Sequence, residues 1–251
     1  MIRIILSGAN GKMGQVIQNC VQERPDCAVV AGIDKNTDSA HGYHVFEKAS
    51  DCGAEADVII DFSHPAVLED LLELAVSRRI PAVIATTGLG ADQISRIHDA
   101  AKEIPIFFSA NMSLGVNLMR ELSKIAAKVL GADFDIEIVE RHHNQKIDAP
   151  SGTALMLADA ISEELVQKPQ YVYDRHSQRK KRSKNEIGLH AVRGGTIVGS
   201  HEVIFAGRDE ILTISHEANS KEIFATGAVN AAIFLHNKAP GLYSMSDLIE
   251  S

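Results

Sequence analysis

Residues 2–14 read Ile-Arg-Ile-Ile-Leu-Ser-Gly-Ala-Asn-Gly-Lys-Met-Gly, a short aliphatic run that leads into three closely spaced glycines. The aliphatic run predicts a buried strand from Ile2 to Leu6. Apolar residues then recur at helical spacing from Met13 to Val21, which predicts an amphipathic helix. A glycine turn between such a strand and a helix is typical of phosphate-binding turns, because backbone without a Cβ lets a pyrophosphate approach the helix N-terminus.

Strands and helices continue to alternate through the first part of the chain. Further strands are expected at residues 27–33, 57–62, 82–85 and 106–109. Helical periodicity follows the second and third of these, beginning near Pro65 and Asp92. Strands that alternate with helices imply right-handed crossovers and a parallel sheet. The sequence therefore predicts an α/β fold with a Rossmann-like, doubly wound parallel sheet.

The pattern changes after about residue 112. A helix with an apolar stripe from Leu118 to Val129 is expected, then a strand at residues 135–140 and a helix from Ser151. The following region is rich in β-branched residues, and the tail is helical again from about Ser220. Strands that follow helices predict a second, α+β domain on an open mixed sheet, mostly antiparallel. We place the first domain at residues 1–112 plus 219–251 and the second at residues 113–218.

The composition argues against several classes of protein. No apolar run approaches the roughly 18 to 20 residues that a bilayer requires, so no membrane contact is expected. A formal net charge of −8 disfavours a nucleic-acid partner, and three cysteines without a CxxC pair predict reduced thiols in the cytoplasm. A basic run at residues 175–184 is interpreted as a solvated loop between a helix and the sheet, with a nucleic-acid or localisation patch as the alternative.

A carboxylate follows the second expected strand at the position that dinucleotide-binding folds use. Asp34 stands 20 residues after Gly14, where it can accept hydrogen bonds from the adenosine ribose hydroxyls. The context therefore predicts a nicotinamide dinucleotide. Asp34 favours NADH, whereas Lys35 could pair with the 2′-phosphate of NADPH or be a plain surface lysine. We expect both NADH and NADPH to be used.

The most informative segment, residues 140–154, reads Glu-Arg-His-His-Asn-Gln-Lys-Ile-Asp-Ala-Pro-Ser-Gly-Thr-Ala. Ser151 is a natural N-cap, and the amides of Gly152 and Thr153 would face an anion at the helix start. Lys146 adds a positive charge, and the adjacent histidines could move protons. The segment predicts a receptor for a small carboxylate. No metal site is expected, because the adjacent histidines lack further ligands at zinc spacing.

These motifs together resemble the dihydrodipicolinate reductase family, over nearly the whole chain. The resemblance rests on residues 8–14, 61–63, 86–88, 110–117, 142–154, 193–195 and 199–202. The pattern His-His-x-x-Lys-x-Asp-Ala-Pro-Ser-Gly-Thr is the most specific of them. Ala85 stands where the family often has glycine, Lys35 where many members have arginine, and His64 where some have arginine. These departures bear on cofactor preference and not on the reaction.

The resemblance implies an NAD(P)H-dependent oxidoreductase that reduces 4-hydroxy-tetrahydrodipicolinate to tetrahydrodipicolinate in L-lysine biosynthesis through diaminopimelate. It implies His142 and Lys146 as the acid/base pair, with Lys146 the proton donor. His143, Gly152 and Thr153 would bind the carboxylate of this small cyclic substrate. The implied cofactor-binding residues are Gly8, Ala9, Asn10, Gly11, Lys12, Met13, Asp34, Lys35, Ala85, Thr86, Thr87, Ser109, Ala110, Asn111 and Met112. A homotetramer built through the sheet of the second domain, which would bind substrate, is also implied.

Two other functions remain open at this point. A semialdehyde dehydrogenase of the same architecture would need a thiolate nucleophile, but no cysteine lies near the carboxylate segment. An NADH-binding redox sensor would need a DNA-binding module, and no basic helix-turn-helix pattern is present. That function would also leave the histidines and Lys146 without a purpose.

Overall fold

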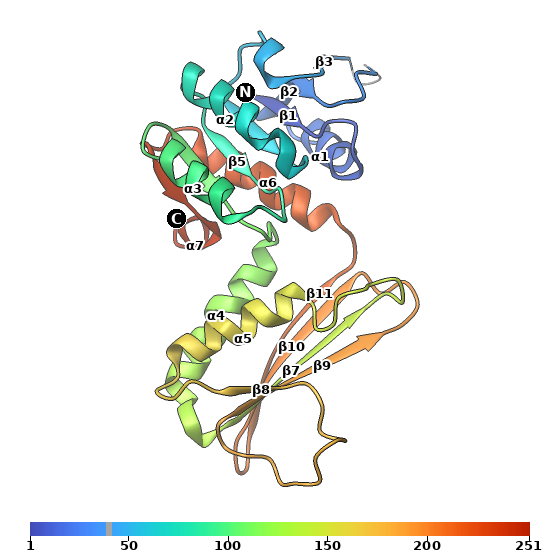
Figure 1. Ribbon diagram of the computed structural model, residues 1–251, viewed down its shortest axis with the longest axis vertical. Coiled ribbons are helices and arrows are strands. Elements are labelled where there is room, and N and C mark those ends of the chain that lie inside the picture. Colours follow the sequence, from blue (N-terminus) through green and yellow to red (C-terminus); the bar gives the residue numbers. More distant parts are fainter. Residues whose placement is uncertain (39–41) are drawn as a thin grey trace. The chain divides into compact units, whose positions relative to one another are not determined.

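The computed structural model describes residues 1–38 and 42–251 (Figure 1). The chain divides into two compact units. Unit 1 comprises Met1–Leu114 and Lys221–Ser251, and unit 2 comprises Gly115–Ser220. Among the described residues, no helix combines the length and the apolar character that crossing a membrane requires.

Unit 1 is built on a seven-stranded parallel sheet in the order β12-β6-β5-β4-β1-β2-β3. Its strands are β1 (Ile2–Ser7), β2 (Cys27–Ile33), β3 (His44–Phe46), β4 (Val58–Asp61), β5 (Ala82–Ile84), β6 (Pro105–Phe108) and β12 (Gly241–Tyr243). Its helices are α1 (Lys12–Gln22), α2 (Leu68–Arg78), α3 (Ala91–Ala100), α6 (Glu222–Leu235) and α7 (Met245–Ile249). The strands progress in one direction from β1 and in the other from β4, which confirms the Rossmann-like doubly wound sheet.

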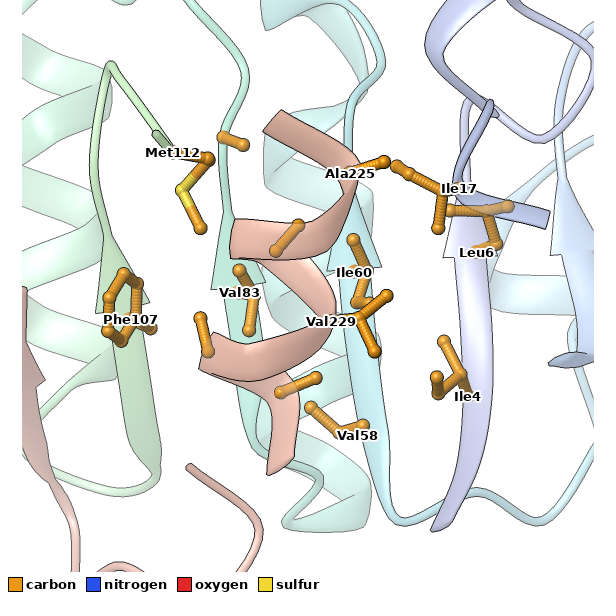
Figure 2. Packing of buried hydrophobic residues seen from close by; sticks show 14 of the residues in the cluster. Ile4, Leu6, Ile17, Val58, Ile60, Val83, Phe107, Met112, Ala225 and Val229 are labelled. Carbon is orange, nitrogen blue, oxygen red and sulfur yellow. The ribbon is translucent and has the colours of Figure 1, made fainter. Parts of the chain in front are cut away.

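Side chains that alternate along the strands of unit 1 enter two hydrophobic clusters. Ile4 and Leu6 of β1 belong to the cluster covered by α1 and α6, whereas Ile5 belongs to the one covered by α2 and α3. Figure 2 shows the first cluster, with Ala225 and Val229 of α6 lying over the strands. Burying each such aliphatic side chain contributes about 1.5–3 kcal/mol. The carboxyl edge of this sheet is therefore a rigid platform for the loops that follow the strands.

Unit 2 is built on a five-stranded sheet in the order β11-β10-β7-β9-β8. Its strands are β7 (Asp135–His142), β8 (Gln170–Val172), β9 (Glu186–Arg193), β10 (Gly199–Ala206) and β11 (Ile211–Ala218). Helices α4 (Leu114–Leu130) and α5 (Gly152–Glu164) pack on one face of this sheet (Figure 1). Met119 and Leu157 of these helices belong to the same hydrophobic cluster as Ile138 and Phe205 of the strands. The open mixed sheet and the α+β character of the unit are confirmed.

Two details of the sequence interpretation are wrong. The second sheet is not mostly antiparallel, because β7–β9 and β8–β9 are parallel while β10–β11 and β10–β7 are antiparallel. The crossover through α5 brings β8 back in the same direction as β7, and the long connection at residues 173–185 brings β9 back in that direction again, which makes these pairs parallel. The basic run at residues 175–184 joins strand β8 to strand β9 and not a helix to the sheet.

Candidate active site

In the glycine turn after β1, the backbone of Gly8 lies very close to that of Phe62, and the backbone of Gly14 lies very close to that of Gly8. Gly8 has a φ of 79°, and a Cβ on it would overlap the carbonyl group of Phe62. A Cβ on Gly14 would overlap the carbonyl oxygens of Gly8 and Ala9. Gly11 is the N-cap residue of α1 and has no side chain with which to cap the helix. This cradle and the helix N-terminus behind it fit the pyrophosphate of a dinucleotide.

The Asp34 carboxylate, directly after β2, is held in place by backbone donors. The amide of Asn10 donates to Oδ2 at 2.9 Å, and the amide of Asn36 donates to Oδ1 at 3.0 Å. The side chain of Asn10 donates to the carbonyl of Asn36 at 2.6 Å, which ties this loop to the glycine turn. Each carboxylate oxygen keeps acceptor capacity for a ribose hydroxyl. Lys35, the next residue, is exposed.

The other residues that the resemblance assigns to the cofactor follow two further strands at the same edge. Ala85, Thr86 and Thr87 follow β5, and Ser109, Ala110, Asn111 and Met112 follow β6. The Ser109 hydroxyl donates to the carbonyl of Asn111 at 2.8 Å, which closes a tight turn after β6. Because the carboxyl ends of parallel strands lie at one edge of the sheet, all of these segments lie at the same edge as the glycine turn.

His142, the last residue of β7, is held by a buried carboxylate that the sequence interpretation did not assign. Its Nδ1 lies 2.6 Å from Oε2 of Glu140, whose side chain is 0 % exposed. Arg193 clamps the same carboxylate with two hydrogen bonds of 2.7 Å, one to each oxygen. Burial opposes ionisation of Glu140, but the hydrogen bonds from Arg193, His142 and Ser151 outweigh it and hold its pKa below the ordinary value. This fixes the ring of His142 with Nδ1 toward Glu140.

The same carboxylate also fixes the start of α5. The amide of Ser151 donates to Oε1 of Glu140 at 3.0 Å, and the Ser151 hydroxyl caps α5 by accepting from the amide of Ala154 at 3.2 Å. Gly152 and Thr153 are the first residues of this helix, so their amides lie at its positive end. One buried carboxylate therefore connects His142 to the helix N-terminus where an anion would bind.

A second histidine, His201 on β10, lies behind this arrangement. Its Nε2 is 3.0 Å from the hydroxyl of Ser151, and its ring meets that of His142 edge to face at 5.2 Å. Burial, reinforced by the neighbouring His142, lowers the pKa of His201 to about 4. His201 is therefore neutral near pH 7 and acts as a hydrogen-bonding partner of the N-cap.

Lys146 lies in the segment between β7 and α5. Its Nζ is 2.9 Å from Oδ1 of Asp148, and this contact holds the pKa of Asp148 below its ordinary value. The backbone amide of Lys146 donates to the carbonyl of His143 at 3.2 Å, and Arg193 donates to the carbonyl of Asp148 at 2.7 Å. The segment thus turns directly after β7 and is attached to the partly buried Arg193 of β9. Among the described residues no cluster of three potential metal ligands occurs.

Glu140 and His201 could have been recognised from one signal in the sequence. Glu140 continues the inward-facing positions of Ile136 and Ile138 on β7, and a charged residue in such a row must have a partner. His201 likewise lies in the same inward-facing row as Val203 on β10. A polar residue at an inward-facing position of a predicted strand is therefore a signal for a buried residue that supports the site.

Comparisons with known proteins agree along the whole chain. Residues 2–112 match the family model described as dihydrodipicolinate reductase, N-terminus, and residues 115–249 match its C-terminus. The 4-hydroxy-tetrahydrodipicolinate reductase of Caldanaerobacter subterraneus is 55 % identical, covering 100 % of this chain and 99 % of the relative. That of Clostridium tetani is 47 % identical, covering 100 % and 98 %.

A solved structure agrees with the sequence comparisons. The dipicolinate-bound dihydrodipicolinate reductase from Paenisporosarcina sp. TG-14 superimposes with a TM-score of 0.83 at 25 % identity, covering 97 % of each chain. Both halves of the sequence and the fold lead to the same assignment. The chain belongs to the dihydrodipicolinate reductase family.

Proposed function

We propose that the chain reduces 4-hydroxy-tetrahydrodipicolinate to tetrahydrodipicolinate with NADH or NADPH, a step in L-lysine biosynthesis through diaminopimelate. The observation that carries this proposal is the arrangement in unit 2, where Glu140 ties His142 to the N-terminus of α5. Lysine, histidine and a helix N-terminus together suit a substrate that carries carboxylates and receives a proton. The related protein from Paenisporosarcina binds dipicolinate, a cyclic dicarboxylate.

The residues of unit 1 that border the glycine turn would hold the dinucleotide, which supplies the hydride when it is bound. In unit 2, His143 and the amides of Gly152 and Thr153 bind a substrate carboxylate at the positive end of α5. Lys146 opposes the negative charge that develops as the substrate ring accepts the hydride, and then donates a proton to the resulting enamine. His142, held by Glu140, completes the acid/base pair. The 4-hydroxyl group leaves as water before the hydride arrives, because hydride addition gives an enamine only from the conjugated imine. Protonation of that enamine then yields tetrahydrodipicolinate, which is released.

The buried cysteines argue against a thioester mechanism. Burial raises the pKa of Cys27 to about 11, and it also raises the pKa of Cys52. Neither thiol is therefore a thiolate near neutral pH. All three cysteines of the chain are free, which supports our inference that the protein works in the reducing cytoplasm.

The experiment that tests the proposal is a coupled assay. Aspartate semialdehyde, pyruvate and the synthase that precedes this step would generate the unstable substrate, while nicotinamide absorbance is followed. We expect NADH and NADPH oxidation that requires both the synthase and this protein. Dinucleotide binding without such oxidation would exclude this substrate and leave a different imine or carbonyl compound as the substrate.

Replacing Lys35 by alanine is expected to weaken NADPH binding by about threefold to fivefold and to leave NADH binding nearly unchanged. Lys35 is exposed beside Asp34, so it can reach a 2′-phosphate that only NADPH carries. Titrations of both cofactors would measure the difference. Lys48→Ala, at an exposed lysine of the same unit, is the control. Equal weakening of the two cofactors would refute a contact with the 2′-phosphate.

We infer that the protein is a homotetramer assembled through unit 2. Large apolar side chains are exposed there, namely Leu118, Leu122, Ile125 and Val129 on α4 and Leu212 on β11. Such a concentration of exposed apolar area is typical of a contact surface. Sedimentation at micromolar concentration is expected to give the mass of four 27.2 kDa chains. A monomeric mass at that concentration would contradict the inference.

A further inference from the structure

A buried carboxylate in unit 1 has no role in the proposed chemistry. Asp61 is the last residue of β4 and is 0 % exposed. Its Oδ1 accepts hydrogen bonds from the hydroxyl of Ser63 at 2.6 Å and from the amide of Ser63 at 3.2 Å. Its Oδ2 accepts from the hydroxyl of Thr86 at 2.6 Å. Asp61 thus binds residues of two different loops, one after β4 and one after β5.

The backbone reinforces the connection between these loops. The amide of Ser63 also donates to the Thr86 hydroxyl oxygen at 3.1 Å, and the amide of Ala85 donates to the Asp61 carbonyl at 3.0 Å. On the other side, the backbone of Phe62 and Ser63 packs directly against Gly8. The segment that Asp61 holds therefore lies between the glycine turn and the Thr86 loop.

Burying a carboxylate is costly, and burial raises the pKa of Asp61 above its ordinary value. The hydroxyl and amide donors of Ser63 and Thr86 oppose this rise. A hydrogen-bonded carboxylate at this position stabilises one arrangement of the loops, because each donor is directed at a fixed oxygen. An apolar residue would fill the same space without fixing either loop.

The sheet order indicates which part of a dinucleotide these loops would meet. Asp34 follows β2 and the glycine turn follows β1, whereas Ser63 and Thr86 follow β4 and β5 on the other side of β1. A dinucleotide crosses such a sheet where the strand order reverses, with its pyrophosphate at the glycine turn. With the adenosine ribose at Asp34, the nicotinamide half would lie at the Ser63 and Thr86 loops.

We propose that Asp61 is a positioning residue that orders the Ser63 and Thr86 loops for the nicotinamide half of the cofactor. The inference rests on the proposed function, because it requires a nicotinamide dinucleotide. It assigns Asp61 no contact with the substrate and no proton transfer. Loss of the carboxylate should therefore affect ligands that carry a nicotinamide ring and spare those that lack it.

The test compares NADH with ADP-ribose, which has the adenosine and pyrophosphate but no nicotinamide. Calorimetric titration of the full chain is expected to show that Asp61→Asn weakens NADH about tenfold, because hydrogen bonds to a charged acceptor are lost. ADP-ribose affinity should stay within about twofold of the wild-type value. Ser63→Ala, which removes one hydroxyl donor, should weaken NADH about threefold and again spare ADP-ribose. This milder variant tests the proposal even if Asp61→Asn does not fold.

Asp57→Asn is the matched control. Asp57 precedes the same strand at its opposite end, where it pairs with Arg3 at 2.8 Å, and this variant should bind both ligands normally. Unchanged NADH affinity in Asp61→Asn, or equal weakening of NADH and ADP-ribose, would overturn the positioning role. Wild-type protein that binds ADP-ribose but not NADH would instead overturn the proposed function, so the two failures are distinguishable.

Discussion

We expect Lys146→Ala to lower turnover by about a hundredfold or more, because the substrate loses both its proton donor and the opposing positive charge. The side chain is 21 % exposed, and its ion-pair partner among the described residues is the exposed Asp148, so its loss leaves the fold intact. Steady-state assays should show the fall in kcat, while titration with NADH should show unchanged affinity. Unfolding temperature should also be unchanged.

Lys146→Arg separates the two contributions of this side chain. A guanidinium keeps the positive charge but does not release its proton at neutral pH. We expect substrate KM to stay near the wild-type value while kcat falls nearly as far as in Lys146→Ala. Lys168→Ala, at an exposed lysine of the same unit, should be fully active. Near wild-type turnover of Lys146→Ala would remove this residue from the mechanism.

His142→Ala is expected to lower turnover by about a hundredfold as well, within the usual range for an acid/base group. This substitution is also expected to lower the stability of the protein, because the buried carboxylate of Glu140 loses a hydrogen bond of 2.6 Å. Leaving a buried acceptor with one partner fewer costs about 1–3 kcal/mol. Kinetics and thermal unfolding should therefore both change, and NADH affinity should not.

His142→Gln distinguishes the chemical role from the structural one. The glutamine amide can donate to Glu140 but cannot transfer protons at neutral pH, so it should restore stability and not turnover. His176→Ala, at an exposed histidine of unit 2, is the control for loss of an imidazole. A glutamine variant with recovered turnover would show that His142 acts through its hydrogen bond to Glu140 and not by proton transfer.

The fold of unit 1 could be predicted because its strands are short, uniformly aliphatic runs. The segment Cys27–Ile33 coincides with β2 as expected. A strand of a parallel sheet that is covered on both faces is a continuous apolar run, and this segment is such a run. β12, Gly241–Tyr243, was missed because three residues are too few to show a period. It is defined instead by pairing with β6, a contact between distant parts of the chain.

The exposed part of the candidate site was predicted from the sequence, whereas its buried acidic residues were not. The exposed segment at residues 142–153 carries an unusual set of polar residues, so it could be found by its composition. Glu140 and Asp61 could not be found that way. Asp61 is a single acidic residue at the end of an aliphatic strand, and Glu140 is one of three acidic residues in β7. Their importance follows from partners that are distant in sequence, Arg193 for Glu140 and Thr86 for Asp61.

Hydride transfer from a nicotinamide to a carbon of the cyclic substrate is the step that defines the proposed function. The most direct measurement uses NADH deuterated at C4 of the nicotinamide, with the substrate generated in place and the product analysed by mass spectrometry. We expect tetrahydrodipicolinate that carries one deuterium with one of the two C4 epimers, and none with Lys146→Ala over the same short reaction time. Unlabelled product with both epimers, or product formed equally fast without this protein, would contradict it.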